Sequence, residues 1–84
     1  MLNKTVSRKD INELFRLMTK YDDTDDIDIY ELALHQSGKM VEQMGSYNSH
    51  FFTELYGVAR DAEHDTMAKY IELLEYLGFE IEEE

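Results

Sequence analysis

Apolar side chains recur near the start of this chain at the spacing of an amphipathic helix. The apolar positions of this segment are Ile11, Leu14, Phe15 and Met18. Their i, i+3, i+4, i+7 order places them on one face of a helix. Ser7, followed three positions later by Asp10, resembles a capping box and marks the helix start. The pattern predicts a first helix over residues 7–20.

Aspartates interrupt this pattern after Tyr21. They are Asp22, Asp23, Asp25, Asp26 and Asp28. Aspartate side chains repel one another and favour turns and N-caps over helix interiors. Asp25 or Asp26 is therefore suited to cap a second helix, which we expect over residues 26–45. The apolar side of this helix is supplied by Tyr30, Leu34, Val41 and Met44.

The longest apolar pattern lies in the C-terminal half of the chain, after Ser49, the expected N-cap. It consists of Phe52, Leu55, Tyr56, Ala59, Ala62, Thr66, Met67, Tyr70, Leu73, Leu74 and Leu77. These positions recur every three or four residues without a change of phase, and Gly78 is a typical helix stop. We expect a third helix over residues 49–78 and a frayed acidic tail over residues 79–84.

These elements predict an all-α fold in one domain, residues 1–84. The first, shorter helix would pack on an antiparallel hairpin formed by the second and third helices, because the turn between those two is short. Three helices of this size offer little core, so self-association is plausible. Candidate exposed apolar residues for such an interface are Phe51, Tyr76 and Ile29.

Charge divides the chain unevenly. Residues 1–20 carry five basic and two acidic side chains, a balance of +3, whereas residues 21–84 carry three basic and seventeen acidic ones, a balance of −14. Such a chain should repel nucleic acid and anionic membranes and attract basic protein surfaces. There is no cysteine, no apolar run of membrane-spanning length and no secretory signal. We therefore expect a cytoplasmic protein.

Carboxylates form a line along the polar side of the expected third helix. Its members are Glu54, Asp61, Asp65 and Glu72. At 100° per residue they fall within about 20° of one another, over about 27 Å of helix. Together with the aspartates at positions 22–28, they could imitate the phosphates of a nucleic acid. The alternative is an ordinary solvated helix face.

Two segments resemble parts of an EF-hand. Ile27 stands four positions before Glu31, as in the exit half of this calcium-binding motif, and a second segment matches its ligand positions 1, 3, 5 and 12. That second segment consists of Asp61, Glu63, Asp65 and Glu72, with Thr66 where the motif has glycine. The resemblance implies a degenerate calcium-binding module, which is an alternative function.

Other chemistry finds less support. Glu31 with His35, and Asp61 with His64, have the spacing of paired metal ligands, but they lack inward-facing carboxylates to complete a centre. We expect no metal and no cofactor. The chain has no cysteine nucleophile, no serine in a catalytic motif and no glycine-rich phosphate loop. We therefore expect no enzyme activity.

One carboxylate, Glu63, falls on the apolar side of the expected third helix. A lone buried carboxylate is costly, so it either pairs with Arg60, one turn earlier, or marks a face buried by another molecule.

The function that these patterns favour is a small acidic binding protein. It would dock its carboxylates into the basic cleft of a nucleic-acid-binding protein and inhibit it, as phage counter-defence proteins do. The expected partner-binding residues are the five aspartates at positions 22–28 and the four-carboxylate line. A further alternative is a helical assembly subunit, a homo-oligomer that uses an apolar interface.

Overall fold

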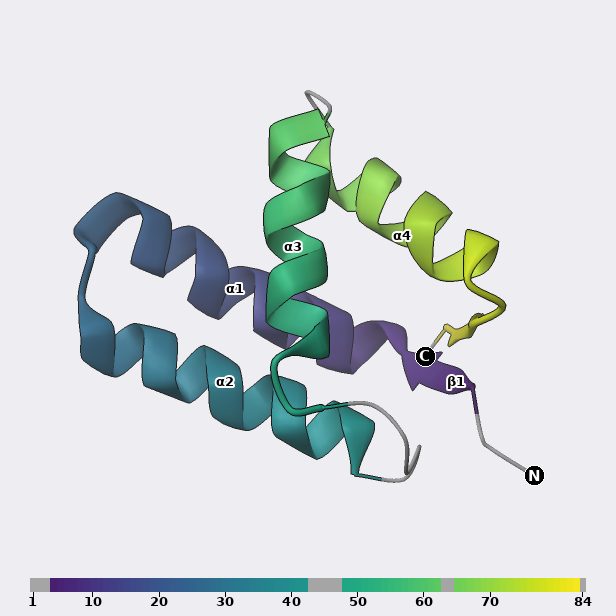
Figure 1. The fold of residues 1–84 in the computed structure, drawn as a ribbon, viewed down its shortest axis with the longest axis horizontal. Coiled ribbons are helices and arrows are strands. Elements are labelled where there is room, and N and C mark those ends of the chain that lie inside the picture. Colours follow the sequence, from purple (N-terminus) through teal and green to yellow (C-terminus); the bar gives the residue numbers. More distant parts are fainter. Residues whose placement is uncertain (1–3, 43–47, 63–64, 84) are drawn as a thin grey trace.

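The computed structural model describes residues 4–42, 48–62 and 65–83. They form four helices and a small two-stranded parallel sheet, which Figure 1 shows in chain order. The elements are β1 (Thr5–Ser7), α1 (Arg8–Thr24), α2 (Ile27–Val41), α3 (Phe51–Ala62), α4 (Thr66–Tyr76) and β2 (Glu80–Glu82). The fold is mostly helical and compact, and the prediction of a three-helix, all-α domain is wrong.

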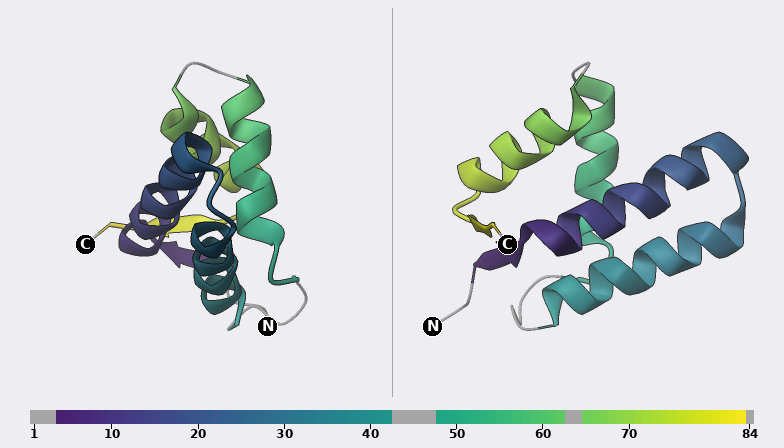
Figure 2. Two further views of the ribbon diagram at one scale, coloured as in Figure 1. Left: turned by 90° about the vertical axis from the view of Figure 1, so that its left-hand side faces the viewer. Right: turned by 180° about the vertical axis from the view of Figure 1, so that it is seen from behind.

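Helices α1 and α2 form the antiparallel hairpin, and the prediction that the second and third helices pair in this way is wrong (Figures 1 and 2). Ser7 is the N-cap of α1, as predicted, and accepts a hydrogen bond from the amide of Lys9 at 3.1 Å. The helix continues beyond residue 20 to Thr24, whose hydroxyl donates to the carbonyl of Lys20 at 2.9 Å. Asp26 then caps α2.

The expected third helix is two helices, α3 and α4. Asp65 adopts an extended conformation and accepts a hydrogen bond from the amide of Ala68 at 3.0 Å, so it caps a new helix. A straight helix over residues 49–78 would be about 45 Å long, longer than the 39 Å long axis of the molecule. The break instead lets α4 pack against α3, where the Tyr70 hydroxyl donates to the carbonyl of Phe52 at 3.1 Å.

The core lies where α3 and α4 meet the N-terminal half of α1. Its largest fully buried apolar residues are Ile11, Leu14, Phe52, Tyr70 and Leu74. Phe15 sits edge-on between Tyr56 and Tyr70, with ring centroids 4.9 Å from each. Helix α2 joins this core through buried Ser37, whose hydroxyl accepts a hydrogen bond from the amide of Phe52 at 3.1 Å.

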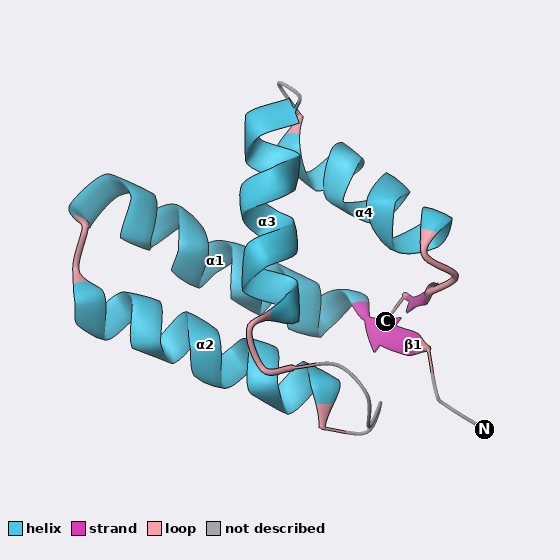
Figure 3. Cartoon of the chain, in the orientation of Figure 1, coloured by secondary structure: helices cyan, strands magenta, loops and turns pink. Residues whose placement is uncertain are grey.

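The two ends of the described chain meet in the sheet, shown as strands in Figure 3. Val6 pairs with Ile81, so the expected acidic tail is partly a β-strand rather than frayed. Gly78 ends α4 as predicted, with a φ of 94° that suits glycine. The amide of Gly78 donates to the carbonyl of Glu75, and that of Phe79 to Leu74, which is a Schellman motif.

Of the three predicted exposed apolar residues, Tyr76 is 86% exposed, whereas Phe51 and Ile29 pack against the core. None of the helices in the described ranges combines the length and the apolar character that a bilayer crossing requires. Ahead of α3, the Asn48 side chain, rather than the expected Ser49, accepts a hydrogen bond from the amide of His50 at 2.8 Å.

Candidate functional site

The five aspartates at positions 22–28 gather at one end of the molecule, where α1 turns into α2 (Figure 1). We call this group the acidic tip; it consists of Asp22, Asp23, Asp25, Asp26 and Asp28. The first two lie in the last turn of α1, the next two form the link, and the last lies in the first turn of α2. All five residues are exposed. Their role in binding a partner stays a prediction.

Asp22 differs from the other members of the acidic tip because it is part of an ion pair. The Arg60 guanidinium donates to its carboxylate at 2.8 Å, and the Tyr56 hydroxyl donates to it at 3.4 Å. Asp22 raises the pKa of Arg60 above its ordinary value, mainly through charge attraction. Burial raises the pKa of Tyr56. The ion pair therefore joins the end of α1 to α3, with Glu63, the expected partner of Arg60, outside the described residues.

Two of the other four aspartates, Asp25 and Asp26, shape the turn. The carboxylate of Asp26 accepts a hydrogen bond from the amide of Asp28 at 3.0 Å and caps α2. Asp25 occupies the left-handed conformation with a φ of 54°, and its amide donates to the carbonyl of Tyr21 at 2.7 Å. Within the described ranges, none of these four carboxylates forms an ion pair. Their charges face solvent.

The predicted line of four carboxylates does not form. Glu54 and Asp61 lie on α3, whereas Asp65 and Glu72 belong to α4, and the two helices run in different directions after the break (Figure 1). Asp61 accepts from Arg60 at 3.3 Å, and Glu72 accepts from Lys69 at 3.4 Å. The line is thus divided into two pairs, and half of its members have a cation beside them.

The basic N-terminal segment contacts the acidic C-terminal one. The Lys4 ammonium donates to the carbonyl of Leu77 at 2.9 Å and lies 5.5 Å from the centre of the Phe79 ring. Arg8 forms an ion pair with Glu83 at 3.4 Å. We call this arrangement of β1, β2 and their ion contacts the terminal clasp. Part of the N-terminal positive charge is therefore neutralised within the chain.

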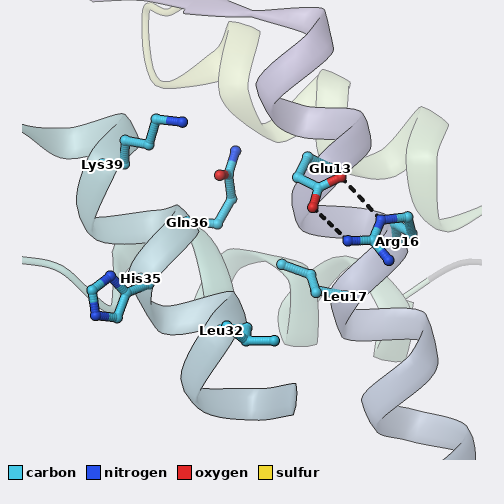
Figure 4. Close-up of a pocket in the computed structure, with 7 residues that line it drawn as sticks. All are labelled: Glu13, Arg16, Leu17, Leu32, His35, Gln36 and Lys39. Atoms are coloured by element: carbon cyan, nitrogen blue, oxygen red, sulfur yellow. Dashed lines mark hydrogen bonds and ion pairs between the residues drawn. The ribbon is translucent and has the colours of Figure 1, made fainter. Parts of the chain in front are cut away.

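Three further cations, Lys9, Arg16 and Lys39, line a groove between α1 and α2, which sequence reasoning missed. Two adjoining hollows of about 230 and 580 Å³ share four lining residues, Glu13, Arg16, Gln36 and Lys39. Figure 4 shows Gln36 and Lys39 on α2 facing Glu13 and Arg16 on α1. Lys9 lines the groove as well. It stands seven positions, or about two helical turns, before Arg16, and this spacing could have indicated that the two cations share one face of α1.

We call this feature the cationic groove. Arg16 donates to the Glu13 carboxylate from two nitrogens, at 3.0 and 2.6 Å, and this hydrogen bonding lowers the pKa of the Glu13 carboxyl. The buried Gln36 amide donates to the backbone carbonyl of Asp10 at 3.0 Å and forms the floor. Lys9 and Lys39 form no ion pair within the described ranges.

The geometry around the acidic tip differs from a calcium loop. Helix α1 runs to Thr24 and α2 begins at Ile27, so two residues separate the helices where an EF-hand has a twelve-residue loop. Glu63 and His64, which belong to the other metal hypotheses, lie outside the described residues. Among the residues that are described, no group of three or more side chains is placed to hold a metal ion.

Comparison of the chain with protein-family models, with curated proteins and with solved structures finds no match. The functional argument therefore depends on the surfaces described above.

Proposed function

We propose that this chain is a non-enzymatic binding protein that docks its acidic tip into a basic cleft of a partner protein. The observation that carries the proposal is the concentration of exposed carboxylates at one end of the molecule. Four of them form no ion pair with any residue in the described ranges. The partner class that fits is a nucleic-acid-binding protein, whose cleft holds cations for phosphates. The chain would inhibit it by occupying that cleft, in the manner of phage counter-defence proteins, in the cytoplasm.

The position of two members of the tip supports this proposal because their charges oppose a helix dipole. Asp22 and Asp23 lie at the C-terminal end of α1, where the helix dipole is negative and no basic residue lies in the last turn. Carboxylates are unfavourable at that end of a helix. A residue pattern that opposes local stability is expected where a surface serves binding.

Association with such a partner should be fast at low salt and slow steeply as salt rises, because long-range attraction between opposite charges is screened within about 10 Å at 0.1 M salt. The measurement is the association rate constant over a salt series. An association rate independent of salt would contradict the proposal.

A capture experiment with two matched variants separates the tip from the rest of the acidic surface. In the tip variant, Asp23, Asp25, Asp26 and Asp28 are replaced by Asn. Asn keeps both the N-cap and the left-handed conformation, so the turn is preserved. In the second variant, the substitutions are Glu54→Gln, Asp61→Asn, Asp65→Asn and Glu72→Gln. Both variants have a net charge of −7 instead of −11.

The expected result is that the native chain and the second variant capture the same nucleic-acid-binding protein from lysate, and that the tip variant does not. Loss of capture by the second variant alone would move the binding surface to α3 and α4. Equal loss by both would mean that overall charge, rather than the tip, drives capture. Retention by both would contradict the proposal.

A further inference from the structure

The cationic groove and the acidic tip have complementary chemistry, although both belong to the same helical hairpin. The groove carries three cations, Lys9, Arg16 and Lys39, against the carboxylates of Asp10 and Glu13. Its local balance is therefore +1 in a chain whose net charge is −11. In the part of the chain that the structure describes, two of these cations, Lys9 and Lys39, form no ion pair, although Lys39 attracts the Glu13 carboxylate across the groove.

Apolar side chains match between the two surfaces as well. Ile27 is 59% exposed in the middle of the acidic tip, between the capping Asp26 and Asp28. Leu32 is 56% exposed and lines the groove beside the buried Leu17 (Figure 4). The tip thus offers an apolar side chain surrounded by carboxylates, and the groove offers the exposed Leu32 together with cations, above the polar floor formed by Gln36.

We propose that the acidic tip of one copy docks in the cationic groove of a second copy. Ile27 contacts Leu32 of the other copy, and the surrounding carboxylates face its Lys9 and Lys39. Charge complementarity on contact is retained at physiological salt, whereas repulsion between the distant parts of two acidic chains is screened beyond about 8 Å.

Because the tip and the groove are different surfaces, the contact is heterologous. Each copy that docks keeps a free groove or a free tip, so association produces open chains or closed rings rather than an isologous dimer. The contact is small, and association is therefore weak and requires high protein concentration. A partner with a more basic cleft competes for the same tip, so self-association would limit the tips available for the proposed function.

Sedimentation equilibrium from micromolar to millimolar protein tests the inference. The native chain should show a weight-average mass that rises above the 10.0 kDa of one copy. The groove variant carries Lys9→Glu and Lys39→Glu, and the tip variant carries Asp23→Lys, Asp25→Asn and Asp28→Lys, so that two lysines face Asp26 as the one unpaired carboxylate of the tip. All five positions are exposed, and circular dichroism checks that each variant folds. Each variant alone should remain at the mass of one copy.

Mixing the two variants should restore association, because the reversed tip of one then meets the reversed groove of the other. A native chain that stays at the mass of one copy at millimolar concentration overturns the inference. So does association of either variant alone to the native extent, which would place the interface elsewhere. If both variants lose association and the mixture does not regain it, tip and groove do not contact each other.

The inference shares the acidic tip with the proposed function but can fail independently of it. The groove variant keeps the tip intact, so it should lose self-association and still capture the basic partner. Should either reversal unfold the chain, Lys39→Gln and Asp28→Asn remove one charge each and should each reduce the association of the native chain. No reduction by either substitution would overturn the inference.

Discussion

The terminal clasp and the acidic tip lie at the two ends of the long axis, and each contains a turn that follows a helix. The two turns are built from different residues. At the terminal clasp, Gly78 takes the left-handed conformation, Phe79 is buried, and Lys4 lies against the last carbonyls of α4. At the acidic tip, Asp25 takes the left-handed conformation and Ile27 is exposed among carboxylates. Opposite charges meet at one end, and like charges collect at the other.

The clasp and the tip therefore differ in how their residues affect the free energy of unfolding. Glycine avoids the roughly 1–2 kcal/mol that a left-handed conformation costs most other residues, and aspartate lowers that cost only in part. Cations near the end of α4 are favourable, and carboxylates at the end of α1 are not. The clasp stabilises the end of α4, whereas in the tip Asp26 stabilises the start of α2 and Asp23 opposes the dipole of α1.

The largest effect should come from removing the apolar anchor of the clasp. Phe79 is 3% exposed and stacks on Phe51 at 5.8 Å between ring centroids. Phe79→Ala should lower the free energy of unfolding by about 3–5 kcal/mol, measured by urea denaturation. Tyr76→Ala, at a position 86% exposed, is the control and should change it by less than about 0.5 kcal/mol. Equal effects would show that the clasp does not contribute more than an ordinary surface.

Gly78, in the clasp, and Gly57, within α3, differ in backbone conformation, so substituting each by alanine should change stability in opposite directions. Gly78→Ala should cost about 1–2 kcal/mol because its φ is 94°, although the nearest atom to an added Cβ, the Lys4 ammonium nitrogen, is at an ordinary 3.6 Å. Gly57→Ala lies within α3, has no atom within 4 Å of its Cβ, and should stabilise the chain by about 0.5–1 kcal/mol. Thermal unfolding of both variants is the measurement, and shifts of the same sign would be the contrary result.

Tyr70 holds together the two helices that carry the clasp. Tyr70→Phe removes its hydrogen bond to Phe52 and should cost about 1 kcal/mol at neutral pH. Burial raises the pKa of Tyr70 above its ordinary value. Its contribution to stability is therefore complete below about pH 10, the pKa of a free tyrosine, and is lost as the pH rises further. Urea denaturation over an alkaline pH series should show a smaller loss in the variant than in the native chain, and equal losses would contradict this assignment.

The smallest effect should come from the tip, where a substitution should increase stability. In Asp25→Asn, the new asparagine can keep the left-handed conformation, and the substitution removes one charge from the acidic tip. It should raise the free energy of unfolding by a few tenths of a kcal/mol at low salt, measured by thermal unfolding. In 1 M salt, where the screening length is about 3 Å, the gain should disappear. A gain that persisted there would be conformational rather than electrostatic.

Local signals in the sequence predicted the features that depend on neighbouring residues. Ser7 and Asp26 cap their helices, and Gly78 ends the last one, because each acts through backbone groups a few positions away. The acidic tip could be located for the same reason, since its five members lie within residues 22–28. These elements require no knowledge of tertiary contacts.

The features that were missed depend on distant residues. The alternation around Ile81 is too short to predict a strand by itself, and its partner Val6 lies near the opposite end of the chain. The apolar phase continues through the break before α4, because both helices face one core, so only the capping preference of Asp65 indicated the break. The cationic groove required the pairing of α1 with α2, which the sequence pattern assigned to other helices.

The parallel pairing of β1 and β2 also determines how the chain would respond to mechanical force. Tension applied between residues 4 and 83 would pull β1 backward from its first residue and β2 forward from its last. The two strands would then slide past each other, so their hydrogen bonds would bear the load together instead of opening one at a time. The sheet would therefore resist tension applied at residues 4 and 83. The acidic tip, at the far end of the hairpin, would carry none of this load.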